Sequence, residues 1–265
     1  SRSGLAKIAV IRLPRISNFT DIAPLEAVDE LDVSYVSNIS QFGDPDVVII
    51  PGSKNTISDL LWMRQNGLEG KILRHAAKGG IVFGICGGYQ MLGQSISDPT
   101  GAEQKGTVRG MGLLPVTTVF EQEKRRTRVS GRFAKVGGAL AEMSGVCYEG
   151  YEIHMGRTVL SKGTVPLVYM EEEGEQRQDG AQSDHVYGCY MHGIFDMSET
   201  VKTFLAAVLR KKGIDPSKIT VRDRNAYKEE QYDRLASIVR ENLNMEAVYK
   251  IIENGNEASC SLLSE

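Results

Sequence analysis

Cys86 stands in a glycine-rich run, Gly84-Ile85-Cys86-Gly87-Gly88, whose types and spacing could support nucleophilic chemistry. The apolar run before it predicts a strand and the run after it a helix, so the cysteine occupies a tight strand-to-helix turn. Such a turn requires small neighbours and lifts the thiol above the carboxyl edge of a sheet. The helix N-terminus beneath it favours the thiolate. A buried structural cysteine is the alternative, but this turn favours a nucleophile.

A cysteine nucleophile needs a base or an ion-pair partner, and His192 is the best placed histidine. It ends the predicted strand 186–191 and so lies at a strand edge next to a turn. His154, on the predicted strand 148–160, is the competitor. Alternation along that strand puts Glu152 and His154 on one face, where they could form a structural pair or part of a pocket. We therefore expect Cys86 and His192 to form the reactive pair.

A second glycine turn, Pro51-Gly52-Ser53-Lys54-Asn55, ends another predicted strand and exposes backbone N–H groups. A phosphate cradle and an oxyanion hole are the two interpretations. The segment lacks the pattern of a nucleotide-binding P-loop. The Gly52-Ser53 backbone, paired with the N–H of Gly87, would suit the stabilisation of an oxyanion during acyl transfer.

The elements that must position these residues alternate between strands and helices. This alternation predicts an α/β protein, a flavodoxin-like three-layer sandwich with a mostly parallel central sheet. The predicted strands are 6–13, 31–37, 46–50 and 81–85, and the predicted helices are 22–29, 56–65, 68–78 and 89–94.

The second half of the chain changes character, because predicted strands follow one another with few helices between them. We interpret them as an antiparallel extension of the same sheet. A helix over 199–211 follows, and the apolar spacing in 225–254 predicts a C-terminal helical tail of two helices. We expect one domain over 1–255 and a disordered tail over 256–265. The predicted strands of this half are 113–120, 126–133, 148–160, 165–170 and 186–191.

Composition narrows the classes of function. The net charge of −3 argues against a nucleic-acid partner that depends on bulk positive charge. No apolar run is long enough for a membrane span, no export signal opens the chain, and the four cysteines show no metal-ligand spacing. We therefore expect a cytoplasmic protein with free thiols and no metal. Since Ser1 is followed almost at once by a predicted strand, we expect upstream sequence to be missing.

Five separated segments carry a resemblance to a known family. The order of these segments resembles that of the class I, triad-type, glutamine amidotransferases. Their residues are similar to those of the amidotransferase half of the cobyric acid synthases, the CobQ type. The resemblance spans roughly residues 5–250. The segments are IRLPRISNFTD at 11–21, PGSKNTISDL at 51–60, FGICGGYQMLG at 83–93, GYEIHMGRT at 150–158 and GCYMHGIFD at 188–196.

The resemblance implies that Cys86 attacks the side-chain amide of glutamine, while His192 passes a proton to the departing ammonia. Gln90 matches a position that helps to hold substrate glutamine. No cofactor is implied for this domain. The resemblance further implies an N-terminal synthetase domain that uses ATP and Mg²⁺ to activate corrinoid carboxylates. Ammonia from this domain would amidate those carboxylates in cobalamin biosynthesis.

One departure from the class I pattern concerns the group that orients the imidazole. Many relatives carry a glutamate two positions after the histidine, and this chain has Ile194 there. The resemblance implies that the cobalamin-type subgroup shares this departure. Glu152 and Asp196 are the carboxylates that we consider in its place, besides a backbone carbonyl or water. We expect modest glutaminase activity from the domain alone.

Three alternatives stay open from the sequence. The chain could serve another synthetase, such as the one that makes cobyrinic acid a,c-diamide or the pair that amidates lipid II. It could be a cysteine hydrolase of the peptidase or chaperone type, which would not require Gln90. It could also be a catalytically weak domain that only docks onto a synthetase. The presence of Cys86, His192 and Gln90 together weighs against the last alternative.

Overall fold

The computed structural model describes residues 4–172, 175–218, 233–234 and 236–240 of the 265-residue chain. Two compact units divide the chain, residues 1–221 and 222–265. All of the elements discussed here belong to the first unit. Most of the segment 225–254, for which two helices are predicted, lies outside the described residues. The parts of it that are described, 233–234 and 236–240, are helical.

The first sheet holds six strands in the order β11-β12-β4-β3-β1-β2. β12, β4, β3, β1 and β2 are parallel to one another, and β11 pairs antiparallel with β12. β3 and β4 are buried along their whole length, as expected for parallel strands covered on both faces. The strands are β1 (Ala6–Ile11), β2 (Leu31–Val36), β3 (Val47–Ile50), β4 (Ile81–Ile85), β11 (Ala181–Ser183) and β12 (Val186–Cys189).

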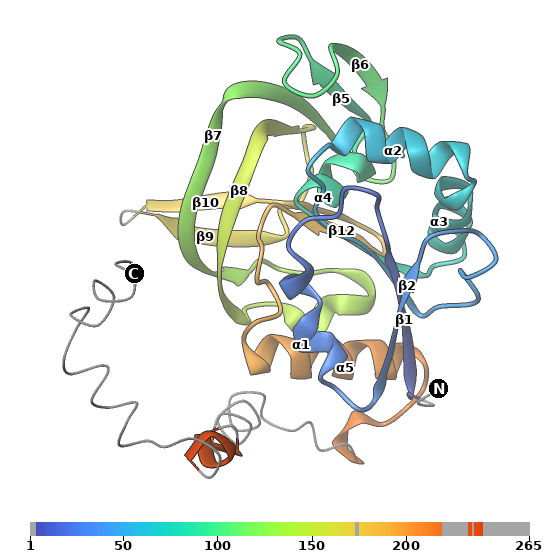
Figure 1. The fold of residues 1–265 in the computed structure, drawn as a ribbon, viewed down its shortest axis with the longest axis vertical. Coiled ribbons are helices and arrows are strands. Elements are labelled where there is room, and N and C mark those ends of the chain that lie inside the picture. Colours follow the sequence, from blue (N-terminus) through green and yellow to red (C-terminus); the bar gives the residue numbers. More distant parts are fainter. Residues whose placement is uncertain (1–3, 173–174, 219–232, 235, 241–265) are drawn as a thin grey trace, which may run out of the picture. The chain divides into compact units, whose positions relative to one another are not determined.

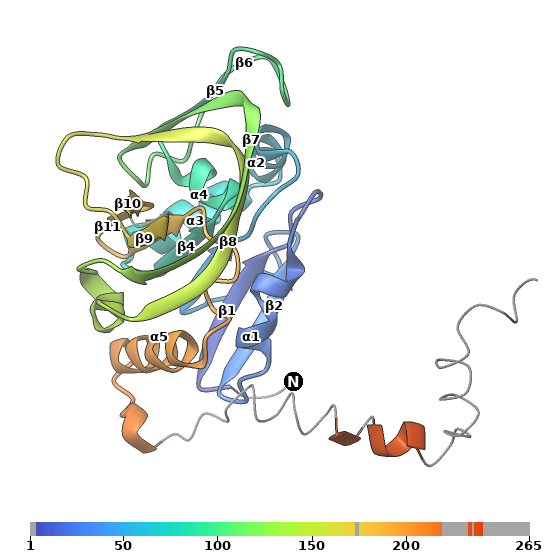
Figure 2. The same ribbon diagram turned by 90° about the vertical axis from the view of Figure 1, so that its left-hand side faces the viewer.

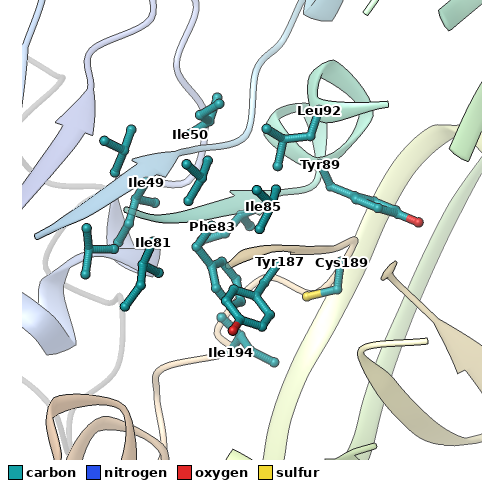
Figure 3. Packing of buried hydrophobic residues seen from close by; sticks show 14 of the residues in the cluster. Ile49, Ile50, Ile81, Phe83, Ile85, Tyr89, Leu92, Tyr187, Cys189 and Ile194 are labelled. Atoms are coloured by element: carbon teal, nitrogen blue, oxygen red, sulfur yellow. The ribbon is translucent and has the colours of Figure 1, made fainter. Parts of the chain in front are cut away.

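Helices cover both faces of this sheet. In Figure 1, α2 and α3 lie on one side of the sheet and α1 and α5 on the other. The apolar contacts across the sheet come from side chains of β3, β4 and β12 and include Phe83, Ile49 and Tyr187 (Figure 3). The helices are α1 (Ala23–Glu26), α2 (Thr56–Gln65), α3 (Leu68–Ala77), α4 (Gly87–Leu92) and α5 (Ser198–Lys211).

The prediction of an antiparallel extension of the same sheet is wrong for most of the second half. These strands form a second six-stranded sheet, in which β8 pairs with β7 off the path β10-β9-β7-β5-β6. Of the strands in this half, β11 and β12 belong to the first sheet, and β11 is antiparallel to its neighbour there. Alternation along a strand reports which face is buried and not which strand it pairs with, and β8 pairs with β7. The strands are β5 (Ser95–Asp98), β6 (Gly106–Arg109), β7 (Val116–Phe133), β8 (Cys147–Leu160), β9 (Val168–Glu172) and β10 (Glu175–Asp179).

Two further expectations are corrected in detail. The predicted strands 113–120 and 126–133 are one strand, β7, with an irregularity in its pairing between Phe120 and Arg125. The predicted helix 22–29 is a single 3₁₀ turn at Phe19–Asp21 followed by the four-residue α1. Because β7 and β8 are long and curved, they sweep along one side of the unit and bring the middle of β8 beside the first sheet (Figure 2).

Candidate active site

The turn at Cys86 is strained in the way that the sequence predicts. Cys86 follows β4 with φ 52° and ψ −108°, in a left-handed region that side chains rarely adopt. The positions that flank Cys86 have room only for glycine. A Cβ placed on Gly84 would lie 2.8 Å from Gly88 C, and one on Gly88 would collide with Ile50 O. β4 and α4 therefore meet at van der Waals distance, with the cysteine held at the junction.

His192 lies at the carboxyl end of β12, which neighbours β4 in the sheet. An isolated antiparallel bridge fixes its backbone: His192 N donates to Tyr151 O at 2.9 Å, and Tyr151 N donates to His192 O at 3.1 Å. The Tyr151 ring stacks on the imidazole with centroids 5.3 Å apart. The second sheet thus supplies the backing for a side chain that the first sheet presents.

Asp21 is the carboxylate that contacts His192, where the sequence had pointed to Glu152 or Asp196. His192 Nδ1 donates to Asp21 Oδ2 at 2.7 Å, and Gly193 N donates to Asp21 Oδ1 at 2.9 Å. Both side chains are buried, Asp21 at 1% exposure. Asp21 follows β1 closely, so it lies at the same carboxyl edge as Cys86. Its place soon after a predicted strand was visible in the sequence, but no local pattern there marked it as the partner of a histidine.

The charge environment of His192 favours its protonated form. Burial opposes the imidazolium, but the hydrogen bonds and negative charges of Asp21 and Cys86 outweigh it and raise the pKa of His192 to about 10. With Nδ1 committed to Asp21, Nε2 is the ring nitrogen left for the sulfur. The arrangement can therefore hold an imidazolium beside a thiolate.

Asn18 is a further residue at this imidazole, and sequence reasoning missed it. Its side-chain Nδ2 lies 3.1 Å from His192 Nδ1 and 3.0 Å from Nε2. Its backbone has φ 54° and ψ 56°, a conformation that asparagine tolerates better than most residues. Asn18 also lines the cavity at Cys86, so it lies between that cavity and the buried imidazole.

Glu152 and His154 form a cluster of their own on β8. Glu152 Oε2 accepts from Arg177 at 2.6 Å, and its Oε1 lies 3.7 Å from His154 Nε2. His154 Nδ1 donates to the carbonyl of Gly156 at 2.8 Å. Although burial opposes it, the nearby His154 imidazole and the hydrogen bond from Arg177 lower the pKa of Glu152 to about 2. Of the two alternatives left open by the sequence, a structural pair and part of a pocket, the structure shows features of both: Glu152 lies beside His154 and Arg177, and His154 also lines the cavity at Cys86.

Asp196 lies in the turn that follows His192. Its backbone N donates to Gly193 O at 2.9 Å. A Cβ placed on Gly193, which has φ 75°, would lie 2.9 Å from an Asp196 carboxylate oxygen. Asp196 therefore packs against the glycine turn through which the chain leaves the imidazole.

The turn after β3 lies directly against the turn at Cys86. The nearest atom to a Cβ placed on Gly87 would be Ser53 N, at 3.0 Å, and next would be Thr56 Oγ1, at 3.1 Å. Among the described residues, neither Ser53 N nor Gly87 N donates to a protein acceptor. Two neighbouring N–H groups beside a cysteine sulfur suit an oxyanion hole.

Side-chain hydrogen bonds hold this turn in place. The Ser53 hydroxyl donates to Asp59 Oδ2 at 2.7 Å, while Arg15 donates to the same carboxylate through its N at 3.1 Å and Nη1 at 3.2 Å. A short backbone ladder runs beside it, with Ser17 N donating to Gly52 O at 2.9 Å and Lys54 N to Arg15 O at 2.8 Å. The segment after β1 is therefore bonded to the segment after β3.

Gln90, one helical turn after Cys86, is buried, and other side chains engage both ends of its amide. Oε1 accepts from the Thr56 hydroxyl at 3.2 Å, and Nε2 donates to Tyr190 Oη at 3.1 Å. Tyr190 Oη in turn lies 2.5 Å from Thr158 Oγ1. The structure thus places Gln90 next to the cavity with its amide held by a hydrogen-bond chain.

Cys86 opens onto a cavity of about 280 Å³ between the two sheets. Its wall carries one cation, Lys54, and one carboxylate, Glu103, besides polar and apolar side chains. The remaining lining residues are Ser17, Asn18, Ser53, Thr56, Gln90, Ala102, Phe120, Ile153, His154 and Met155. Within the described ranges, no group of three or more His, Cys, Asp or Glu side chains could hold a metal ion. No helix among the described residues is long and apolar enough to span a membrane.

Comparisons with known proteins agree with this geometry. Residues 7–200 match the sequence profile described as a CobB/CobQ-like glutamine amidotransferase domain. A cobyric acid synthase of Ruminiclostridium cellulolyticum is 52% identical over 258 residues, which are 96% of this chain and 50% of that protein. A cobyric acid synthase of Lachnoclostridium phytofermentans is 44% identical, over 94% of this chain and 50% of that protein.

Among solved structures, PurLQS from Thermotoga maritima superposes with a TM-score of 0.57 at 17% identity. The match covers 78% of this chain and 99% of that one. A structure described as a glutamine amidotransferase gives a TM-score of 0.55 at 16% identity, over 78% and 99% of the two chains. At these identities the likeness concerns the fold, an α/β arrangement with mixed sheets. The chain spans about half the length of the curated relatives that it matches.

Proposed function

Because the chain belongs to the CobB/CobQ-like glutamine amidotransferase domains, we propose that Cys86, His192 and Asp21 are the groups that hydrolyse its glutamine. Family membership confirms the resemblance seen in five sequence segments, and it makes the chain an amidotransferase domain. The observation that carries the assignment of residues is the 2.7 Å hydrogen bond from His192 Nδ1 to Asp21 Oδ2, at an imidazole whose pKa is raised by both Asp21 and Cys86.

The first half-reaction forms a thioester and releases ammonia. The Cys86 thiolate attacks the side-chain carbonyl carbon of glutamine, a C–S bond forms, and the carbonyl electrons move onto oxygen. His192 Nε2 then gives its proton to the amide nitrogen as the C–N bond breaks, so that NH₃ leaves. Asp21 keeps Nδ1 protonated and the ring oriented, as the acid of a serine triad does.

The oxyanion of the tetrahedral intermediate is assigned to the N–H groups of Ser53 and Gly87. Each donor would bind the negative oxygen more strongly than the neutral carbonyl, which lowers the barrier rather than the ground state. Fixing both donors before substrate arrives avoids the cost of reorganisation. This role agrees with the expectation for Gly52-Ser53 from the sequence, and Gln90 keeps the proposed part of holding substrate glutamine.

The second half-reaction hydrolyses the thioester. Neutral His192 takes a proton from a water molecule as its oxygen attacks the acyl carbon. The tetrahedral intermediate collapses with the thiolate as leaving group, which yields glutamate and restores the imidazolium–thiolate pair. Glutamine and water are thereby converted into glutamate and ammonia with no redox change.

The setting of this activity is also part of the proposal. The chain spans about half of cobyric acid synthases that are 44 to 52% identical to it. We assign residues 1–255 to the amidotransferase half of such an enzyme. An ATP- and Mg²⁺-dependent synthetase domain would be its partner and would hold the corrinoid carboxylates to be amidated. The order β2-β1-β3-β4-β12 of the parallel strands supports a flavodoxin-like arrangement for the domain.

One assay tests the proposed function. Glutamate release from glutamine is measured for the wild type, Cys86→Ala and His192→Ala, each with and without the synthetase half. We expect release that Cys86→Ala abolishes and His192→Ala lowers by several orders of magnitude, with the higher rate in the presence of the partner half. The absence of Cys86-dependent release in every combination would reduce the chain to a docking domain.

A further inference from the structure

Asn18 contacts the imidazole of His192 over the face of the ring. Its Nδ2 is nearly equidistant from the two ring nitrogens, 3.1 Å from Nδ1 and 3.0 Å from Nε2. The lone pair of Nε2 lies in the ring plane and points away from Nδ1, so a donor aligned with it would lie much farther from Nδ1. A position in the plane on the other side would overlap the ring carbon between the two nitrogens. The amide therefore lies against the π face of the ring.

The amide atom that faces the ring favours one charge state of the imidazole. An N–H group is attracted to the electron-rich face of a neutral aromatic ring and is repelled by an imidazolium. The amide oxygen has the opposite preference, because its partial negative charge is attracted to a cation. A half turn about the last side-chain torsion of asparagine exchanges the nitrogen and the oxygen. Asn18 can therefore present either atom at the same place.

Few contacts restrain the amide of Asn18. The residue precedes the 3₁₀ turn Phe19–Asp21, where asparagine ordinarily caps a helix, but its side chain makes no capping hydrogen bond. Within the described residues, the hydrogen-bonding contacts of this side chain are those to His192. Asn18 also lines the cavity at Cys86, where water can solvate the amide atom that is turned away from the ring. The amide is thus able to turn.

The other groups around the imidazole cannot reverse their polarity. Asp21 is a carboxylate held by two hydrogen bonds, and Asp196 packs against the turn that follows the imidazole. Burial and neighbouring negative charges raise the pKa of Tyr151, so the ring that stacks on His192 stays a neutral phenol. The charge of Cys86 does change, because a thioester has no thiolate. Its loss removes one cause of the raised pKa of His192.

We infer that Asn18 is a positioning residue for His192, whose amide turns as the imidazole changes charge. Its oxygen faces the imidazolium of the first half-reaction, and its nitrogen faces the neutral imidazole that deprotonates water in the second. The inference rests on the proposed function, because His192 serves there first as an acid and then as a base. A side chain of one fixed polarity at position 18 should therefore change the two half-reactions unequally.

The test measures the formation and the decay of the Cys86 thioester separately. The protein with its synthetase half is mixed with glutamine and quenched in acid, and intact mass gives the acylated fraction over time. Asn18→Asp presents only oxygen to the ring. Asn18→Gly removes the side chain and keeps the φ of 54° without strain. Asn38→Asp is the matched control, because Asn38 is exposed and an aspartate there can keep the hydrogen bond from Ser40 N.

We expect Asn18→Asp to slow the decay of the thioester about tenfold or more relative to its formation, so that acylated protein accumulates. The added carboxylate favours the imidazolium and leaves less neutral imidazole to take a proton from water. Decay in this variant should therefore recover as the pH is raised. Hydroxylamine, a stronger nucleophile than water, should release the acyl group as a hydroxamate and restore the free thiol. Asn18→Gly should slow both steps together, and Asn38→Asp should match the wild type.

Two results would overturn the inference and leave the proposed function standing. One is a wild-type ratio of formation to decay in Asn18→Asp. The other is a decay in Asn18→Asp that stays equally slow at every pH, because that pattern assigns the loss to packing and not to charge. If instead the wild type forms no adduct on Cys86 and releases no glutamate from glutamine, the proposed function itself is wrong.

Discussion

Asp21 Oδ2 lies 2.7 Å from His192 Nδ1, although 171 positions separate the two residues in the chain. The carboxylate comes from the segment after β1 and the imidazole from the end of β12, with β3 and β4 between those strands in the sheet. Parallel strands make such a meeting natural, because their carboxyl ends share one edge. In the proposed mechanism Asp21 takes the role that a glutamate at position 194 would have in many class I relatives.

Replacing Asp21 with asparagine should cripple catalysis while the fold persists. The amide can still accept from Gly193 N, but it neither holds the Nδ1 proton nor stabilises the imidazolium. We expect kcat to fall by about two to four orders of magnitude, as for the equivalent change in serine triads. Glutamate release by Asp21→Asn, with Asp196→Asn as the comparison, checks this. Equal losses in both variants would contradict a special role for Asp21.

The alkaline limit of activity should move with Asp21. Since the pKa of His192 is raised to about 10, the imidazolium that protonates the leaving ammonia persists until the pH rises through that value. The Asp21→Asn change removes a cause of the raised pKa, so the descending limb of kcat/KM should shift to lower pH. A pH–rate profile of both proteins tests the direction, and an unshifted limb would argue against the pair.

A methyl group at Gly87 should damage the oxyanion site selectively. Its Cβ would lie 3.0 Å from Ser53 N and 3.3 Å from Ser53 Cβ, so the two donors must move apart. We expect Gly87→Ala to lower kcat about a hundredfold or more, with a smaller change in KM, as for loss of one oxyanion donor. Gly70→Ala, in α3, adds a Cβ whose nearest heavy atom is Arg74 Nη1 at an ordinary 3.7 Å, and serves as the control. Wild-type kcat in Gly87→Ala would remove these N–H groups from the mechanism.

The Glu152 cluster should contribute stability that depends on pH. Its pKa is lowered from the ordinary value of 4.5 to about 2, so its contribution is complete above pH 4.5 and is lost as the pH falls through about 2. Glu152→Gln removes the charge opposite Arg177 and His154 and should cost about 1–3 kcal/mol near pH 7. Urea unfolding of the two proteins at several pH values measures it. The difference should shrink in acid, and a constant difference would mean that shape and not charge is responsible.

The loss of Asp59 should destabilise the protein more than the loss of its ion pair with Arg15 alone. Asp59→Ala leaves the Ser53 hydroxyl and Arg15 N without their shared acceptor and should cost about 1–3 kcal/mol, together with a loss of activity. Arg15→Met removes only the guanidinium, whose side chain is 51% exposed, and should cost about 1 kcal/mol or less. Thermal unfolding and glutamate release report on both variants. Equal effects would assign the stabilisation to the salt bridge.

The sequence predicted the first sheet well because its strands have simple patterns. Runs such as Val47–Ile50 and Ile81–Ile85 contain no polar side chain, and Asn66-Gly67 marks the end of the helix at 56–65. The partner sheet of β7 and β8 was misassigned because alternation reports that one face is solvated, and not which sheet a strand joins. That choice depends on contacts between distant segments.

In the candidate site, too, residues with a local sequence pattern were predicted and residues placed by distant contacts were not. Cys86 was recognisable because a tight strand-to-helix turn requires glycines beside it. Asp21 was not, because a short polar residue before a helix is ordinarily a cap, and nothing local distinguishes a capping carboxylate from one aimed at a distant imidazole. Gln90 lines the cavity at Cys86, and the hydrogen bonds of its amide to Thr56 and Tyr190 depend on distant segments that no local pattern reports.

The segments that follow β1 and β3 are joined by backbone hydrogen bonds, and this affects how they move. One segment leads to Asp21, the proposed acid that aligns the imidazole, and the other carries Ser53, one of the two proposed oxyanion donors. Because Ser17–Gly52 and Lys54–Arg15 hydrogen bonds join them, the two segments form a single frame. If the edge of the sheet moves, the two segments move together. The distance between the proposed acid and the proposed oxyanion donor therefore changes less than it would if the two groups stood on separate loops.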